Sequence, residues 1–193
     1  MTKIFFSIFL LFNLSALYSC SPGGILASGG ATTMVVAEGD RTLGTVVDDA
    51  TIKINISSNL LSSGTDLFVN VNTNVIEGRV LLTGIVDTQE IRIETVRKVW
   101  EVEGVREVIN EIEIGNKTTI KEYANDLWIT TQVKGLAAKT IGLRALSYNF
   151  ETIKGKVYIA GITSRPEQLD QVVEAARTVK GVNEIVNYVI VKE

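Results

Sequence analysis

The feature that most constrains the fold is a stretch that the chain contains twice. Each copy is a glycine, a basic residue, a short apolar strand and a second glycine, and the copies lie 77 positions apart: Gly78-Arg79-Val80-Leu81-Leu82-Thr83-Gly84 and Gly155-Lys156-Val157-Tyr158-Ile159-Ala160-Gly161. The same spacing relates Asp49 to Asp126, Gly104 to Gly181 and Asn110 to Asn187, with no insertion or deletion. The chain therefore contains a duplicated unit.

Each copy has the periodicity of an α-β-β-α-β unit. In the first copy, Ile52, Ile56 and Leu60 form a helical stripe that Asp48 and Asp49 can cap. Further patterns predict strands at 70–76, 79–86 and 105–114, with a helix that begins at Asp87 or Thr88 and ends at Gly104. In the second copy they predict helices over 125–138 and 166–181, and strands over 145–152, 156–163 and 182–191.

The predicted fold class is α+β, with two tandem units that each have a three-stranded mixed sheet and two helices on one face. We place the first unit at 48–115, a linker at 116–124 and the second unit at 125–193. Units of this size are near the lower limit for a self-sufficient core. We therefore expect the uncovered face of one sheet to meet the other repeat.

The composition gives no support to an enzyme. Histidine is absent, which removes the commonest general base and the commonest metal ligand. Helix capping explains Asp48, Asp49 and Asp126 without a metal, and we find no phosphate-binding loop, Ser/His/Asp set or pair of catalytic carboxylates. We expect no enzymatic activity, no cofactor, no metal site and no nucleic-acid partner.

The amino terminus has the pattern of an export signal. Lys3 precedes an apolar run over 4–17, which is too short for a transmembrane helix. The run ends in Leu17-Tyr18-Ser19-Cys20, which resembles the bacterial lipobox. One interpretation removes residues 1–19 and lipidates Cys20, the only cysteine. The other is ordinary signal-peptide cleavage near Ser19, which leaves Cys20 as a free thiol.

The resemblance to bacterial lipoproteins implies a diacylglycerol thioether and an acylated amine on Cys20. Several acyl chains on one residue give a stable membrane anchor. In that group, a serine such as Ser21 after the cysteine favours the outer membrane over the inner one. The Gly- and Ser-rich stretch that completes residues 20–47 then has the composition of a flexible tether.

The repeated unit resembles the BON domain in its element order, its Gly-basic-Val strand and its helix that ends in Gly-Val. Two such units behind a lipobox, with the run Asn125-Asp126-Leu127-Trp128-Ile129-Thr130-Thr131, resemble the dual-BON lipoproteins of Gram-negative outer membranes. The resemblance covers about residues 40–192 and departs from the family within 135–143. It implies a non-enzymatic protein on the outer membrane, facing the periplasm, that binds phospholipid and supports membrane integrity.

Differences between the copies indicate where function lies, because shared positions are those that the fold requires. Residues 48–114 hold 6 basic and 12 acidic side chains, a net charge of −6, whereas residues 125–193 hold 9 and 7, a net charge of +2. Lys134, Lys139, Arg144, Lys154 and Lys156 face only one acid, Glu151, in the local sequence. This cluster is either a patch that attracts anionic lipid or an ordinary solvated surface.

Trp128 is the second difference, because the equivalent residue of the first copy is Thr51. A tryptophan at the margin of an amphipathic helix is typical of an interfacial membrane contact, although it can also fill the seam between repeats. We expect the second repeat to bind anionic phospholipid through five residues of this helix: Trp128, Thr131, Lys134, Gly135 and Lys139.

Two further interpretations stay open. In one, the acidic first repeat and Trp100 dock a protein, such as an outer-membrane assembly or division protein. In the other, the chain recognises peptidoglycan.

Overall fold

A computed structural model of the chain describes residues 42–64, 70–116 and 118–192. The predicted signal peptide, Cys20 and the predicted tether up to residue 41 lie outside the described residues, so the two interpretations of Cys20 stay predictions. No helix of the described part is long and apolar enough to cross a membrane.

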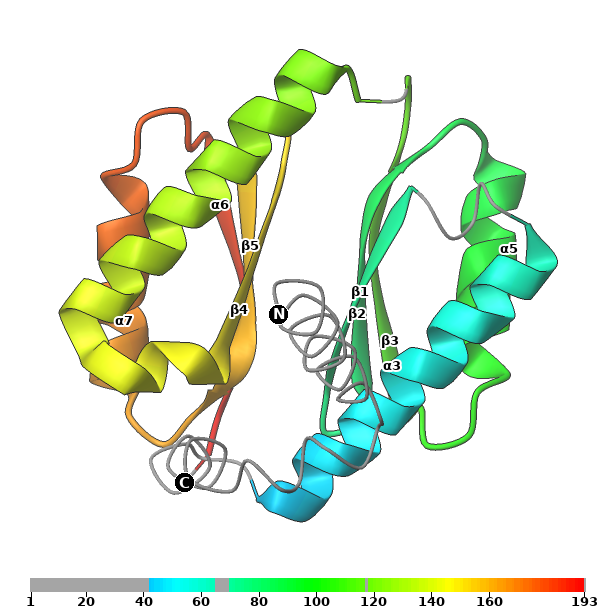
Figure 1. Ribbon diagram of the computed structural model, residues 1–193, viewed down its shortest axis with the longest axis horizontal. Helices are drawn as coiled ribbons and strands as arrows, with labels where there is room; N and C mark the ends of the chain where they lie inside the picture. The colour runs from blue at the N-terminus through cyan, green and yellow to red at the C-terminus, as the bar shows by residue number, and fades with distance from the viewer. Residues whose placement is uncertain (1–41, 65–69, 117, 193) are drawn as a thin grey trace, which may run out of the picture. The chain divides into compact units, whose positions relative to one another are not determined.

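Each repeat folds as the α-β-β-α-β unit that the sequence predicts (Figure 1). The first repeat consists of α3 (Leu43–Ser63), β1 (Val71–Ile76), β2 (Arg79–Val86), α5 (Gln89–Trp100) and β3 (Glu107–Ile114). The second consists of α6 (Ile120–Ile141), the 3-10 helix η3 (Gly142–Ser147), β4 (Tyr148–Ile153), β5 (Lys156–Thr163), α7 (Pro166–Arg177) and β6 (Glu184–Val191). The α+β fold class is confirmed.

The two sheets have the same mixed topology. Their orders are β1-β2-β3 and β4-β5-β6, and the first pair of each is antiparallel while the second is parallel. In each repeat both α-helices lie on one face of the sheet (Figure 1). The cores lie under those helices, around Ile56, Leu60 and Val99 in the first repeat and around Ile129, Val133 and Val172 in the second.

The first helix of each repeat begins earlier than the sequence predicted. Thr42 caps α3, and Thr119 caps α6 in a reciprocal capping box with Glu122. Residues 43–47 of the predicted tether and 120–124 of the predicted linker are therefore helical. One strand, by contrast, begins later than the sequence predicted. The strand predicted over 145–152 begins at Tyr148, because residues 142–147 form the 3-10 helix.

Asp48, Asp49 and Asp126 lie inside helices and do not cap them, which corrects their predicted role. Asp49 is buried inside α3, and its carboxylate accepts hydrogen bonds from the backbone N–H groups of Glu77 and Gly78, at 2.8 and 2.9 Å. Asp126 in α6 accepts the equivalent bonds from Lys154 and Gly155, at 2.7 and 2.9 Å. We call each arrangement an Asp clasp, because it ties the first helix of a repeat to its hairpin turn.

The first glycine of each repeated stretch is explained by these two hairpin turns. Gly78 and Gly155 have φ values of 74° and 78°, in the left-handed region that favours glycine. A Cβ at Gly78 would lie 2.7 Å from the carbonyl oxygen of Gly104, and a Cβ at Gly155 would lie 2.7 Å from that of Gly181. The glycines therefore allow each hairpin turn to contact the loop after the second α-helix of its repeat.

A third cluster of buried side chains draws from both repeats and confirms the expected contact between the uncovered sheet faces. Its buried members are Ile76, Leu81, Tyr158, Ala160 and Ile162. We call this region the seam.

Polar contacts border the seam. The hydroxyl of Tyr188 donates a hydrogen bond of 2.5 Å to Glu111, and Lys192 pairs with Glu77. Burial, followed by the bond to Glu111, raises the pKa of Tyr188 to about 12. In both contacts the acidic residue comes from the first repeat and the donor from the second, which agrees with the more negative charge of the first copy.

We predict that Asp49→Ala lowers the free energy of unfolding by about 2–4 kcal/mol, because two backbone donors lose a charged acceptor in a buried place. Urea unfolding followed by circular dichroism measures the loss. Asp48→Ala is the matched control, since Asp48 is the exposed neighbour in the same helix, and it should change the stability by less than about 0.5 kcal/mol. Equal effects of the two variants would contradict the role given to the clasp.

We also predict that the second repeat alone, residues 118–193, is less stable than the same repeat within residues 36–193. Tyr158 and Ile162 are 1% and 0% exposed in the two-repeat structure, and removal of the first repeat returns the apolar surface of the seam to water. The midpoint of urea unfolding compares the two forms, and identical midpoints would contradict a stabilising seam.

Candidate functional site

Helix α6 has a buried face and an outward face with different chemistry. The buried residues are Asp126, Ile129, Thr130, Val133 and Ala137. Successive residues of a helix are rotated by about 100°, which places a second set opposite them: Ile120, Ala124, Leu127, Trp128, Thr131, Gly135 and Ala138. We call this second set the outward face.

The outward face is uncharged and carries large apolar groups in contact with solvent. Ile120 is 89% exposed, Leu127 56% and Trp128 48%. Burying such side chains in another apolar medium would be favourable by about 25 cal/mol for each Å² removed from water. A face of this kind is suited to contact with an apolar partner or with a membrane.

Lysines border the outward face on both sides. Lys121 and Lys139 lie at one margin of the helix surface and Lys134 at the other, and all three are exposed. Lysine side chains at such margins can place their ammonium groups among anionic headgroups while the stems stay on apolar surface. The 3-10 helix η3 follows directly and exposes Leu143 (57%) and Leu146 (59%).

The structure brings the five predicted contact residues together on one surface of α6. Trp128, Thr131 and Gly135 belong to the outward face, and Lys134 and Lys139 lie at its margins. Ile120 is not among the predicted contact residues, because residues 116–124 were predicted to be a linker. The capping pattern of Thr119 followed by Glu122 was the signal that could have extended the helix.

Trp128 lies outside the seam cluster, which draws its buried residues from strands. Its exposed fraction of 48% and its position opposite the buried face of α6 speak against packing between the repeats. Trp100, which we also considered for such packing, is outside the cluster too and is 50% exposed at the end of α5.

The predicted basic cluster is divided by the fold, which is a correction. The ammonium group of Lys156 lies 3.6 Å from Glu111 and 3.8 Å from Glu184, and 5.2 Å from the centre of the Tyr158 ring. Lys156 therefore belongs to the border of the seam. Its principal acidic neighbour, Glu111, comes from the other repeat and could not be found in the local sequence.

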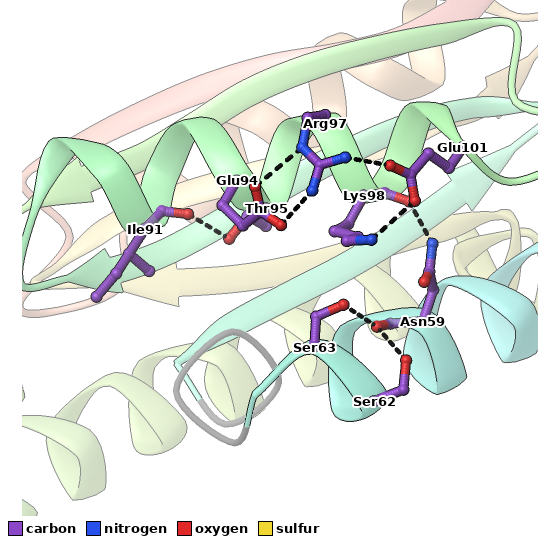
Figure 2. Close-up of polar contacts among 9 residues, drawn as sticks. All are labelled: Asn59, Ser62, Ser63, Ile91, Glu94, Thr95, Arg97, Lys98 and Glu101. Atoms are coloured by element: carbon purple, nitrogen blue, oxygen red, sulfur yellow. Dashed lines mark hydrogen bonds and ion pairs between the residues drawn. The ribbon is translucent and has the colours of Figure 1, made fainter.

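Two acidic side chains, Glu94 of α5 and Glu101 at its C-cap, pair with basic residues of the same helix. Arg97 bridges Glu94 and Glu101, and Lys98 also pairs with Glu101 at 3.0 Å (Figure 2). Hydrogen bonds from Arg97 and Lys98 hold the pKa values of Glu94 and Glu101, respectively, below their usual range. Asn59 of α3 joins this network by donating to the carbonyl of Lys98 at 2.8 Å. These four charged residues sum to zero, so the net charge of −6 on the first repeat comes from its other residues.

Helix α3 occupies the equivalent place in the first repeat and provides an internal comparison. It also exposes apolar residues, Val47, Ile54 and Leu61. However, the positions that correspond to Lys121, Lys134 and Lys139 are Gly44, Ser57 and Ser62, and the position of Trp128 is Thr51. The lysine margins and the tryptophan are therefore specific to α6.

Comparisons with known proteins agree with the duplicated fold. The BON domain family matches residues 48–116 and 125–193. A protein of Anaplasma centrale, described as "Uncharacterized protein in gshII 5'region", is 37% identical over 147 residues, which is 76% of this chain and 96% of the relative. A 21 kDa hemolysin of Actinobacillus pleuropneumoniae is 34% identical over 154 residues, 77% of this chain and 78% of the relative.

The outer membrane lipoprotein DolP of Haemophilus influenzae is 28% identical over 160 residues, which covers 82% of each chain. The matches extend over both repeats and agree with the architecture of two equivalent units. The chain therefore belongs to the BON domain family, with two copies of the domain in tandem.

Proposed function

We propose that this protein is a non-enzymatic component of the bacterial cell envelope that binds anionic phospholipid through α6 of its second BON domain. The observation that carries the proposal is the uncharged outward face of α6, with exposed Ile120, Leu127 and Trp128 between margins of lysine. An amphipathic helix of this composition lies in the membrane interface, with its apolar side chains inserted and its lysines near anionic headgroups.

We further propose that the protein is attached to the outer membrane and faces the periplasm, where it supports membrane integrity. The lipobox-like sequence before Cys20 and the name of the Haemophilus relative, an outer membrane lipoprotein, support this location. An acyl anchor would hold α6 close to the bilayer and raise its effective concentration there. A weak contact through α6 would then be sufficient to distinguish membranes by their lipid charge.

A second candidate function is docking of a protein of the envelope or of outer-membrane assembly by the first repeat. The exposed Trp100 at the end of α5 favours this candidate, because tryptophan is enriched among the residues that dominate binding at protein interfaces. Both functions can coexist, since Trp100 and the outward face of α6 belong to different repeats.

We predict that Trp128→Glu in residues 36–193 abolishes binding to phosphatidylglycerol vesicles, because a carboxylate would have to enter the interface of an anionic bilayer. Co-sedimentation measures binding, and circular dichroism should be unchanged because Trp128 is outside the core. Thr51→Glu is the matched control: it adds the same charge at the equivalent exposed position of α3 and should bind as the unmodified chain does. Unchanged binding by Trp128→Glu would reject the site.

The same assay should show a strong dependence on salt and on lipid charge. Exposed charges are screened within about 10 Å at 0.1 M salt, so raising the salt should weaken the attraction between the marginal lysines and the vesicles. We expect Lys139→Gln to reduce binding severalfold, whereas vesicles of phosphatidylcholine should bind weakly at every salt concentration. Binding that is independent of both salt and lipid charge would contradict the role of the lysines.

A further inference from the structure

A polar cavity of about 390 Å³ lies beside the edge strands of the two sheets. Its lining comes from α3, β1 and β2 of the first repeat and from α6, β4 and β5 of the second. Residues at equivalent positions of the two copies line it together, such as Asn72 and Asn149, or Leu81 and Tyr158. The cavity is therefore a product of the duplication, because a single repeat supplies only part of its lining.

Two lysines line the cavity, one from each repeat. Lys53 belongs to α3 and Lys134 to α6, and among the described residues neither forms an ion pair within 4.0 Å. Both lysines act on the carboxyl group of Glu151. Burial raises the pKa of this carboxyl group, and the positive charges of the two lysines lower it. The charged side chains of the lining are two lysines and one glutamate, Lys53, Lys134 and Glu151, so the lining has an excess of positive charge.

Uncommitted amide groups complete the lining. Asn72 donates a hydrogen bond of 2.9 Å to Glu151. By contrast, the side chains of Asn74 and Asn149 make no hydrogen bond within the described part of the chain, although both line the cavity and both are half-buried. Amides have donors and an acceptor on one group, which suits them to bind neighbouring hydroxyl groups of a ligand.

We propose that the cavity binds a phosphorylated polyol, with the phosphate held by Lys53 and Lys134 and the hydroxyl groups by Asn74 and Asn149. The volume falls within the range of small-molecule sites, roughly 300–1,000 Å³, and accommodates a hexose phosphate. Two ammonium groups from different elements suit an anion, and free amides suit the hydroxyls beside it. The same chemistry occurs in a free sugar phosphate and in the glycerol phosphate headgroup of a lipid.

Isothermal titration calorimetry of residues 36–193 with D-glucose 6-phosphate tests the proposal, with glucose and inorganic phosphate as partial ligands. We expect binding of the phosphosugar that is tighter than that of either fragment. Lys53→Met should weaken it at least about tenfold, through loss of a charged hydrogen bond, and Asn74→Ala should weaken it severalfold. Lys180→Met removes an exposed lysine that does not line the cavity and should leave the affinity unchanged.

Binding to phosphatidylglycerol vesicles distinguishes between a lipid headgroup and a free sugar phosphate as the ligand. If the headgroup occupies the cavity, Lys53→Met should weaken vesicle binding as Trp128→Glu does; if the ligand is a free sugar phosphate, only the calorimetric titration should respond to Lys53→Met. In either case Trp128→Glu should bind glucose 6-phosphate normally, because Trp128 does not line the cavity. The cavity proposal is overturned if glucose 6-phosphate does not bind, or if Lys53→Met and Lys180→Met lower the affinity for it equally. Either result leaves the membrane proposal standing.

Discussion

The Asp clasp is the interaction on which the surface of each repeat depends. A buried carboxylate in the first helix accepts two backbone hydrogen bonds from a hairpin turn, in both repeats. A helix held at a buried residue in this way cannot rotate about its own axis. Because Trp128 follows Asp126 by two positions, or about 200° of helical rotation, the clasp directs the tryptophan toward solvent. The exposed chemistry of α6 is therefore a consequence of its buried aspartate.

Duplication separates the requirements of the fold from those of function. Asp49 and Asp126, together with Gly78 and Gly155, are alike because the clasp and the hairpin turn need them. The helices α3 and α6 share this frame but differ where the frame imposes no constraint, as at Thr51 and Trp128. The seam adds a requirement that neither repeat has alone, since Leu81 and Tyr158 are buried in a cluster with residues of both copies.

The parts of the structure that local patterns encode could be predicted from the sequence. The order of helices and strands followed from periodicity. The place of Trp128, at an exposed surface or in the seam, stayed open in the sequence, and the structure shows it exposed and outside the seam cluster. The Asp clasp was not predicted, because a carboxylate near a predicted helix start can cap the helix with a local hydrogen bond. Its actual partners lie in a hairpin turn that begins 28 residues further along the chain. The pairing of Lys156 with Glu111 and the lining of the cavity require contacts between repeats, which no local pattern contains.

The charge distribution gives the proposed membrane contact a direction. The first repeat carries a net charge of −6 and the second +2, so an anionic bilayer repels one and attracts the other. Some of the acidic charge is satisfied at the border of the seam, where Glu111 faces Lys156 and Glu77 faces Lys192. If the protein binds membranes as proposed, the remaining asymmetry would orient it before contact, because charges steer an approaching molecule over distances of about a Debye length. On this proposal the acidic repeat acts in membrane binding by repulsion, which turns α6 and its lysines toward the lipid.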